Sequence, residues 1–249
     1  VLICLALYQP RLARFRPVLA SGLAGTLLLS IAWSTSDLIR HRDFAGDWDV
    51  INCDVGQGDA LLVRSAGRIA LVDVGREPTP INNCLEDLSI EVIDLLVISH
   101  FDADHAGGIA GALSGRSVGT AVISGFRDDR PLVAIVNDAL EESGVKILSG
   151  FAGMSGELGD LNWRVLAPSA QAKEAKDSND ASVIISFSGP QFGVLALGDL
   201  GEEGQLRLMR NSEASLRALS SKPLVLKVAH HGSADQSNEL FRLLTPEIS

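Results

Sequence analysis

Four side chains that can bind a metal ion occur within one run of six residues. They are His100, Asp102, Asp104 and His105, and Gly107-Gly108 follows them. Capping of the next helix explains at most one of them, for example Asp104. Because a tight turn directs all four side chains into one small volume, the run predicts a metal site. Imidazole and carboxylate ligands without thiolates suit Zn or Mn, and a carboxylate-rich set favours Mn or Mg.

Two later segments offer further ligands. In Leu195–Asp199 (LALGD) a glycine and then Asp199 follow an apolar run, and a carboxylate in that position can bridge two cations. In Val228–Ser233 (VAHHGS) two histidines, His230 and His231, follow another apolar run. The three segments together predict one or two divalent metal ions. Two cations about 3.5–4 Å apart would clamp the attacking and leaving oxygens of a phosphodiester, and a bound cation lowers the pKa of water toward about 7–9.

Three more carboxylates lie at glycine-containing turns. Asp54 and Asp59 belong to the run DVGQGD, and Asp73 belongs to LVDVG. Glycine allows the backbone to approach an anion or a metal closely. We expect these carboxylates to shape the site and orient its ligands, rather than to bind the metal directly.

The candidate ligands follow the carboxyl ends of predicted strands. The predicted strands are Trp48–Cys53, Ala60–Arg64, Arg68–Val74, Ile93–Ser99, Asn162–Ala167, Ser182–Ser188, Phe192–Leu197 and Leu224–Ala229. The predicted helices are Gly107–Leu113, Pro131–Ser143, Glu202–Leu219 and Asn238–Leu244. Two groups of strands, each followed by helices, indicate an α/β fold in which packed sheets carry helices on their outer faces.

The first 35 residues differ from the rest of the chain. Val1–Tyr8 is an apolar run too short to span a bilayer, the basic run RLARFR follows it, and Pro17–Trp33 then has 17 uncharged residues. That length is at the lower limit for a transmembrane helix, and tryptophan is common at membrane interfaces. A signal peptide and a buried helix are the alternatives. We predict a membrane segment at 1–35, the first part being the end of a truncated helix, a linker at 36–46 and a domain at 47–249. The positive-inside rule places that domain on the non-cytoplasmic side.

Charge is distributed unevenly along the chain. The net charge is −10, and residues 1–43 carry five arginines and two aspartates, or +3, so residues 44–249 carry about −13. Such an acidic domain argues against a broad basic surface for nucleic acid. Binding of DNA phosphates would depend on the metals and on a few basic residues, Arg127, Arg130, Lys222 and Lys227.

Three other sequence features indicate little. Cys4, Cys53 and Cys84 show no CxxC spacing, and an odd count gives no complete disulfide framework, although Cys53 is expected to be buried. Gly115–Gly119 matches the G-x-S-x-G pattern of serine hydrolases, but the required order of strand and helix is reversed, so we interpret it as a turn. The sequence contains no Walker A pattern.

At these residues the sequence resembles the metallo-β-lactamase superfamily, whose hallmark is HxHxDH. It resembles more closely the carboxyl-terminal domain of ComEC-type competence proteins, the channels of DNA uptake. The motifs DVGQGDA, LVDVG, SHFDADHAGG, NDASVIISF, LALGD and KVAHHGS occur between residues 53 and 233 in the order expected of that family.

The resemblance implies a metallo-β-lactamase-like αββα sandwich after a transmembrane helix, in a multi-pass protein of the cell membrane. It implies a metal-dependent hydrolase, a deoxyribonuclease that degrades one DNA strand while the other crosses the channel. Single-stranded DNA, the membrane, the rest of the channel and other competence proteins would be its partners. The expected cofactor is one or two divalent ions of Mn or Zn, with Mg as a third choice.

The resemblance also assigns roles to individual residues. The expected metal ligands are His100 and Asp102 for one ion, Asp104 and His105 for the other, Asp199 as the bridge and His230 completing the second site. Asp104 and His231 are the expected catalytic residues. His231 and Ser233 would contact the phosphate or the leaving oxygen.

The sequence departs from the superfamily pattern at two places. Asp102 replaces the second histidine of the hallmark, which weakens the preference for Zn. No histidine lies between His105 and His230, so the usual mid-chain ligand is missing, and Asn179, Asp180 or Ser182 would be a weaker substitute. We also expect the domain to be truncated at its carboxyl end. Two other functions fit the pattern, a non-catalytic module of the same fold that guides DNA at the channel, and a small-ester hydrolase.

Overall fold

The structure is a computed structural model, and it describes residues 24–28, 30, 46–126, 128–170 and 175–249. The chain falls into two units, residues 1–46 and residues 47–249. Most of the predicted membrane segment and the predicted linker up to residue 45 lie outside the described residues, while residues 24–28 and 30 are helical. Within the described ranges, no helix combines the length and the apolar character that a membrane crossing requires.

One sheet of the second unit contains six strands in the order β1-β2-β3-β4-β5-β6. They are β1 (Val50–Asn52), β2 (Leu61–Ser65), β3 (Arg68–Val72), β4 (Val92–Ile98), β5 (Ser117–Ser124) and β6 (Lys146–Gly150). The strands β1 to β3 form an antiparallel meander, and β3 to β6 run parallel. Helices connect the parallel strands: α3 (Pro78–Asp87), α4 (Ala103–Ala106), α5 (Ile109–Leu113) and α6 (Pro131–Glu142).

The other sheet contains five strands in the order β11-β10-β9-β8-β7. They are β7 (Ser155–Leu158), β8 (Leu161–Ala167), β9 (Ile184–Ser188), β10 (Gly193–Ala196) and β11 (Leu224–Lys227). All neighbours are antiparallel except β10 and β11, which α7 (Glu202–Leu219) connects. A 3-10 turn, η3 (Ala229–Gly232), and α8 (Asn238–Leu244) follow β11.

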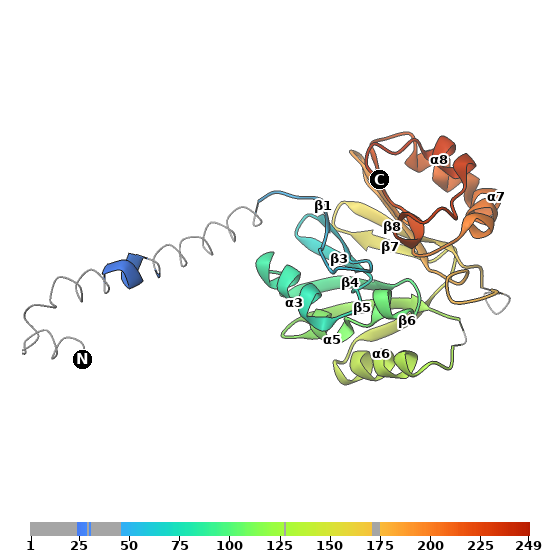
Figure 1. The fold of residues 1–249 in the computed structure, drawn as a ribbon. Helices are drawn as coiled ribbons and strands as arrows, with labels where there is room; N and C mark the ends of the chain where they lie inside the picture. Colours follow the sequence, from blue (N-terminus) through green and yellow to red (C-terminus); the bar gives the residue numbers. More distant parts are fainter. Residues whose placement is uncertain (1–23, 29, 31–45, 127, 171–174) are drawn as a thin grey trace, which may run out of the picture. The chain divides into compact units, whose positions relative to one another are not determined.

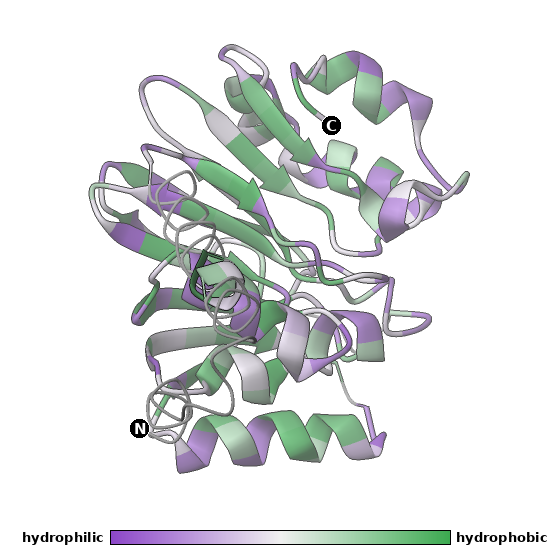
Figure 2. Ribbon diagram, turned by 60° about the vertical axis from the view of Figure 1, so that its left-hand side comes forward, coloured by the Kyte–Doolittle hydropathy of each residue, from purple (hydrophilic) through white to green (hydrophobic). Residues whose placement is uncertain are grey.

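Side chains that alternate along the strands build three apolar layers. In β2, Leu61 and Val63 face the second sheet, whereas Leu62 faces the helices that cover the first. In β9, Ile185 faces the first sheet and Ile184 packs toward α7 and α8. Figure 1 shows α3, α5 and α6 on one outer side and α7 and α8 on the other, and Figure 2 shows that the strands between them are largely hydrophobic. The predicted αββα sandwich is confirmed.

Several elements of the fold were not predicted. They are α3, α4, β5, β6 and β7. Prolines, glycines and polar residues interrupt these segments, and only tertiary packing selects their conformation. Gly115 has the left-handed φ of a turn, but Ser117 already belongs to β5, so only the first part of the G-x-S-x-G segment is a turn.

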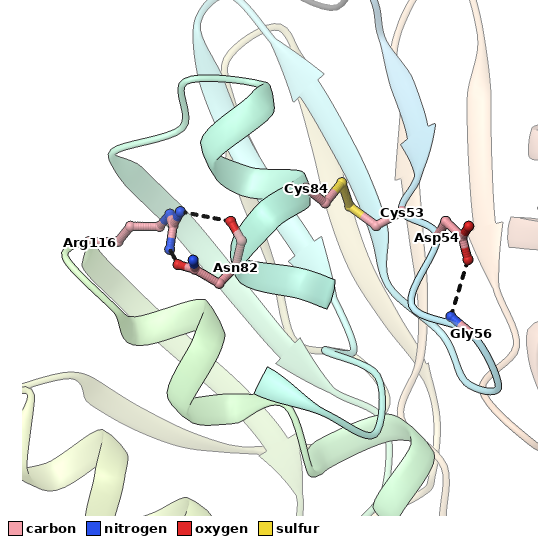
Figure 3. The surroundings of a disulfide bond; sticks show 6 residues. All are labelled: Cys53, Asp54, Gly56, Asn82, Cys84 and Arg116. Atoms are coloured by element: carbon pink, nitrogen blue, oxygen red, sulfur yellow. Dashed lines mark hydrogen bonds between the residues drawn. A yellow bond between two sulfur atoms is a disulfide. The ribbon is translucent and has the colours of Figure 1, made fainter. Parts of the chain in front are cut away.

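A disulfide joins Cys53, at the end of β1, to Cys84 in α3 (Figure 3). Arg116 holds the same helix, because its guanidinium donates to the side-chain oxygen and the backbone carbonyl of Asn82 at 3.0 and 3.2 Å. Cys53 is buried as expected. The cysteine count and spacing did not predict this pair, because the two residues lie 31 positions apart and meet only in the folded chain.

Candidate metal centre

Asp73 connects the ends of two parallel strands at the centre of the site. It follows β3 with a left-handed φ of 61°, and it is almost completely buried. Its carboxylate accepts hydrogen bonds from the backbone and the hydroxyl of Ser99 at 2.7 and 2.8 Å, and lies 2.9 Å from Nδ1 of His105. With the carboxylate as acceptor, Nδ1 carries the proton and Nε2 is left as the atom that can bind a metal. Asp73 can therefore orient His105, and its role beside a metal ligand stays a prediction.

The buried part of the site is formed by His100, His105 and Asp199. Nε2 of His105 lies 3.1 Å from Oδ1 of Asp199, and Nε2 of His100 lies 3.8 Å from Oδ2. Ligand atoms of the three residues lie within 4.8 Å of one another. Both Nε2 atoms and Oδ1 of Asp199 are buried without a hydrogen bond among the described residues. Because buried polar atoms are nearly always satisfied, this arrangement fits a bound cation.

Glycine conformation brings Asp199 into this position. Gly198 precedes it with a φ of 49°, and a Cβ at Gly198 would lie 2.9 Å from Cβ of Ser182 and 3.1 Å from Cβ of Ser99. Ser182 accepts a hydrogen bond from the backbone of Asp199 at 3.3 Å. The strand-glycine-aspartate pattern therefore places the carboxylate beside both histidines.

His231 completes a second group of ligand atoms, together with Asp59 and His105. Its Nδ1 lies 3.1 Å from Asp59, and its Nε2 lies 3.3 Å from Asp104 and 3.9 Å from Asp199. Rings of His100, His105 and His231 follow one another at centroid distances of 4.2 and 5.2 Å. Asp104 and His231 are the partly exposed members of the centre, with side chains 15% and 27% exposed.

The structure brings His231, and not the predicted His230, to the carboxylates. Both residues have left-handed φ angles, 50° and 53°, and their rings are nearly perpendicular. The backbone N–H of His230 donates to the carbonyl of Gly198 at 3.0 Å. Its side chain is exposed, and no interaction among the described residues joins it to a carboxylate of the centre. The tight turn of η3 decides which of two adjacent histidines faces inward.

A buried ion pair positions Asp59. Oδ2 of Asp59 lies 2.6 Å from Nζ of Lys227, which also donates to the carbonyl of Val228 at 2.6 Å. Burial raises the pKa of Asp59, and Lys227 opposes this rise. A Cβ at Gly58 would lie 2.2 Å from the carbonyl oxygen of Asp104, so only glycine allows the Asp59 turn to approach the ligand turn this closely. Lys227 was expected to contact DNA, but here it balances Asp59.

Asp102 lies at the edge of the centre, between a histidine and an arginine. Its Oδ2 is 3.8 Å from Nε2 of His100, whereas its Oδ1 is 2.6 Å from Nη1 of Arg130. Burial opposes ionisation of Asp102, but Arg130 and His100 outweigh it and lower the pKa of the carboxyl group. Asp102 is absent from both groups of converging ligand atoms.

The remaining predicted residues lie farther out. Asp54 accepts a hydrogen bond from the backbone of Gly56 at 3.2 Å, so it stabilises its own turn. Asp180 pairs with Arg207. Asn179 accepts from the backbone of Ser182 through its carbonyl at 3.1 Å. Of the three mid-chain candidates, Ser182 is the one that contacts a residue of the centre.

The buried histidines and carboxylates of the centre shift one another's pKa values. Burial opposes the charge on His105, but Asp73 and Asp199 outweigh it and raise the pKa of the imidazole to about 11. Burial likewise opposes ionisation of Asp199, but His105 and His100 lower the pKa of that carboxyl group to about 2. His100, which is strongly buried beside His105, has a lowered pKa. A divalent cation would be held by His105 with its Nε2 deprotonated and by ionised Asp199.

The chain matches the metallo-β-lactamase superfamily over residues 53–129, the segment that contains Asp59, Asp73 and the ligand turn. It is 29% identical over 217 residues to ComE operon protein 3 of Bacillus subtilis. It is 27% identical over 201 residues to competence protein ComA of Neisseria gonorrhoeae and 26% identical over 212 residues to recombination protein 2 of Haemophilus influenzae. Over this segment the chain is similar to metallo-β-lactamases, and the relatives that match most of its length are ComEC-type competence proteins.

The matches cover 79%, 78% and 81% of this chain, but 26%, 25% and 24% of the relatives. The chain therefore spans about a quarter of the length of these proteins. Among solved structures, a metallo-β-lactamase from Pontibacter korlensis aligns with a TM-score of 0.46 and 14% identity, covering 79% of this chain and 91% of that one.

Replacing Asp73 with asparagine is expected to lower the affinity for divalent metal about 10–100-fold, the usual effect of losing an outer carboxylate. Asparagine tolerates the left-handed φ at this position, so the backbone is preserved. Its amide cannot accept hydrogen bonds at both terminal atoms, so His105 loses its fixed orientation. Titration of the variant with Mn, followed by calorimetry, measures the effect. An affinity equal to that of the wild type would show that Asp73 does not orient His105.

Proposed function

We propose that the chain hydrolyses phosphodiester bonds with the help of divalent metal ions and degrades one DNA strand during uptake. The observation that carries the proposal is the group of buried, unsatisfied ligand atoms on His100, His105 and Asp199, directly beside the partly exposed Asp104 and His231. Competence proteins among the relatives support DNA as the substrate.

His100, His105 and Asp199 would hold the first cation, and Asp104 and His231 lie where a second could bind or where the substrate enters. A bound cation supplies a hydroxide nucleophile near neutral pH and stabilises charge on the phosphate oxygens. Asp59 fixes the ring of His231 through Nδ1 at 3.1 Å, so that Nε2 faces the open side of the centre. His231 can therefore hold a proton close to the leaving oxygen, while Asp104, 3.3 Å away, balances its charge.

A nuclease assay of the 249-residue chain tests this proposal. We expect cleavage of single-stranded DNA in the presence of Mn, Zn or Mg, and a decrease of at least about 100-fold when Asp104 is replaced by alanine. Asp138→Ala, which removes an exposed carboxylate on α6, is the matched control and should leave the rate unchanged. Equal cleavage by wild type and Asp104→Ala would identify a contaminating nuclease. No cleavage with any metal would reject catalysis.

A non-catalytic module that guides DNA at the channel is the second candidate. Two observations favour it. Asp102 forms an ion pair with Arg130, and the sequence has no mid-chain histidine, so few side chains near His100 can bind a metal. In that case the chain would bind single-stranded DNA with metal present but leave it intact. The same assay, run with a binding measurement, separates the two functions.

We also propose that the domain lies on the non-cytoplasmic side of the cell membrane, as part of a longer multi-pass channel. The disulfide between Cys53 and Cys84 supports this location, because disulfides persist in oxidising compartments and are rare in the cytosol. Single-stranded DNA, the remaining channel and other competence proteins are the proposed partners.

A further inference from the structure

Arg130 is fixed beside the metal centre by side chains from three separate segments. Its guanidinium donates from Nη1 to Asp102 at 2.6 Å, from Nε to Asp128 at 2.9 and 2.8 Å, and from Nη2 to the hydroxyl of Ser178 at 2.7 Å. Asp102 belongs to the ligand turn, Asp128 to the loop before α6, and Ser178 to the segment before β9. Such convergence holds the planar guanidinium in one orientation.

The guanidinium remains accessible although it is well anchored. The side chain of Arg130 is 43% exposed. Asp102 connects it to the buried ligand atoms, because Oδ2 of Asp102 lies 3.8 Å from Nε2 of His100. Lys227, the basic residue on the Asp59 side of the centre, is only 17% exposed and bonds to Asp59 and a carbonyl. Of these two basic residues, Arg130 is the one that an external anion can reach.

We propose that Arg130 is the phosphate-binding residue of this centre and that Asp102 is its positioning residue rather than a metal ligand. This inference rests on the proposed phosphodiesterase function and names the residue that receives the substrate. The guanidinium also donates from Nη2 to Asp128, so an N–H on Nη1 is the donor without an acceptor among the described residues, and it can donate to a phosphate oxygen. A preoriented guanidinium loses little freedom when it forms such a bond. The geometry also explains why an aspartate stands where the superfamily has a second histidine, because a carboxylate can anchor an arginine.

The local charge makes anion binding at Arg130 dependent on metal. Arg130 pairs with two carboxylates, Asp102 and Asp128. Before a metal binds, these three side chains therefore carry a net charge of −1. Asp199 and Asp104 add further negative charge nearby. A phosphate oxygen would be repelled until a divalent cation neutralises part of this charge. We therefore expect Mn to bind first and phosphate to bind second.

Calorimetric titration of the 249-residue chain, first with Mn and then with inorganic phosphate, tests the proposal. Arg130→Gln should weaken phosphate binding by about tenfold or more, the loss expected for a charged hydrogen bond, and should leave the number and affinity of bound Mn ions unchanged. Arg130→Lys should recover part of the affinity. Asp102→Asn should also weaken phosphate binding and keep the Mn stoichiometry. Arg217→Gln removes the same charge from an exposed pair with Glu213 on α7 and is the matched control.

Three results would overturn the proposal. The first is a wild-type chain that binds no phosphate when loaded with Mn, and the second is Arg130→Gln that binds phosphate as tightly as the control variant. The third is Asp102→Asn that loses a Mn ion, since this would make Asp102 a metal ligand. Because these readouts are binding constants, they are independent of cleavage. Failure of the proposed nuclease function would instead appear as intact DNA after incubation with a chain that still binds Mn and phosphate.

Discussion

The chain with Asp199 replaced by asparagine is expected to lose metal binding and with it all metal-dependent hydrolysis. Asp199 is the residue whose two carboxylate oxygens face both buried histidines, at 3.1 Å from His105 and 3.8 Å from His100. Asparagine has the same shape but only one oxygen and no negative charge. Loss of a residue that only orients a ligand lowers metal affinity about 10–100-fold. Asp199 would bind the metal directly, so we expect the affinity for Mn to fall by more than about 100-fold.

Calorimetry with Mn and the nuclease assay together measure this effect. In this variant His100 and His105 face an amide and lose their negatively charged partner, which can lower the stability of the fold. The melting temperature of the metal-free variant is therefore measured as well. Asp160→Asn, an exposed position in the turn between β7 and β8, is a control of the same chemistry. Retention of wild-type Mn affinity by a folded Asp199→Asn chain would refute the metal centre as described.

Replacing Cys53 and Cys84 together with serine is expected to lower the free energy of unfolding by about 3–4 kcal/mol. The pair closes a loop of 31 residues, and the chain-entropy model gives this value for a loop of that length. For a domain of this size the melting temperature should fall by about 7–15 °C. The disulfide also ties the start of the Asp59 turn to α3, a helix that Arg116 holds independently (Figure 3).

Thermal unfolding of the wild type with and without reductant, beside the double variant and Cys4→Ser, measures this contribution. The reduced wild type should match the double variant, and Cys4→Ser should match the oxidised wild type. Alkylation of thiols in intact cells before lysis should find Cys53 and Cys84 protected, because the domain is proposed to lie in an oxidising compartment. Reduced cysteines in such cells would contradict that location, and identical melting of all forms would contradict a stabilising disulfide.

Motif spacing was sufficient to predict the layered fold and the approach of Asp199 to the turn at 100–105, while their roles as metal ligands stay a prediction. Continuously apolar strands end at these motifs, and the carboxyl ends of neighbouring strands meet at one edge of a sandwich. The buried strand β4 and the turn after it therefore appear in the sequence as they appear in the structure. Asp73 was predicted to support ligands rather than to bind metal, and its hydrogen bonds to Ser99 and His105 fit that prediction.

Other features depend on directions and partners that no local pattern contains. The choice of His231 over His230 is made by two successive left-handed residues in η3. The pairing of Asp102 with Arg130 requires a loop 28 positions away to fold back beside the ligand turn. Cysteines 31 positions apart meet only because α3 packs over the end of β1. Sequence spacing determines which residue types reach the edge of a sheet. Backbone dihedral angles and long-range packing decide which atom of each residue faces the candidate metal centre.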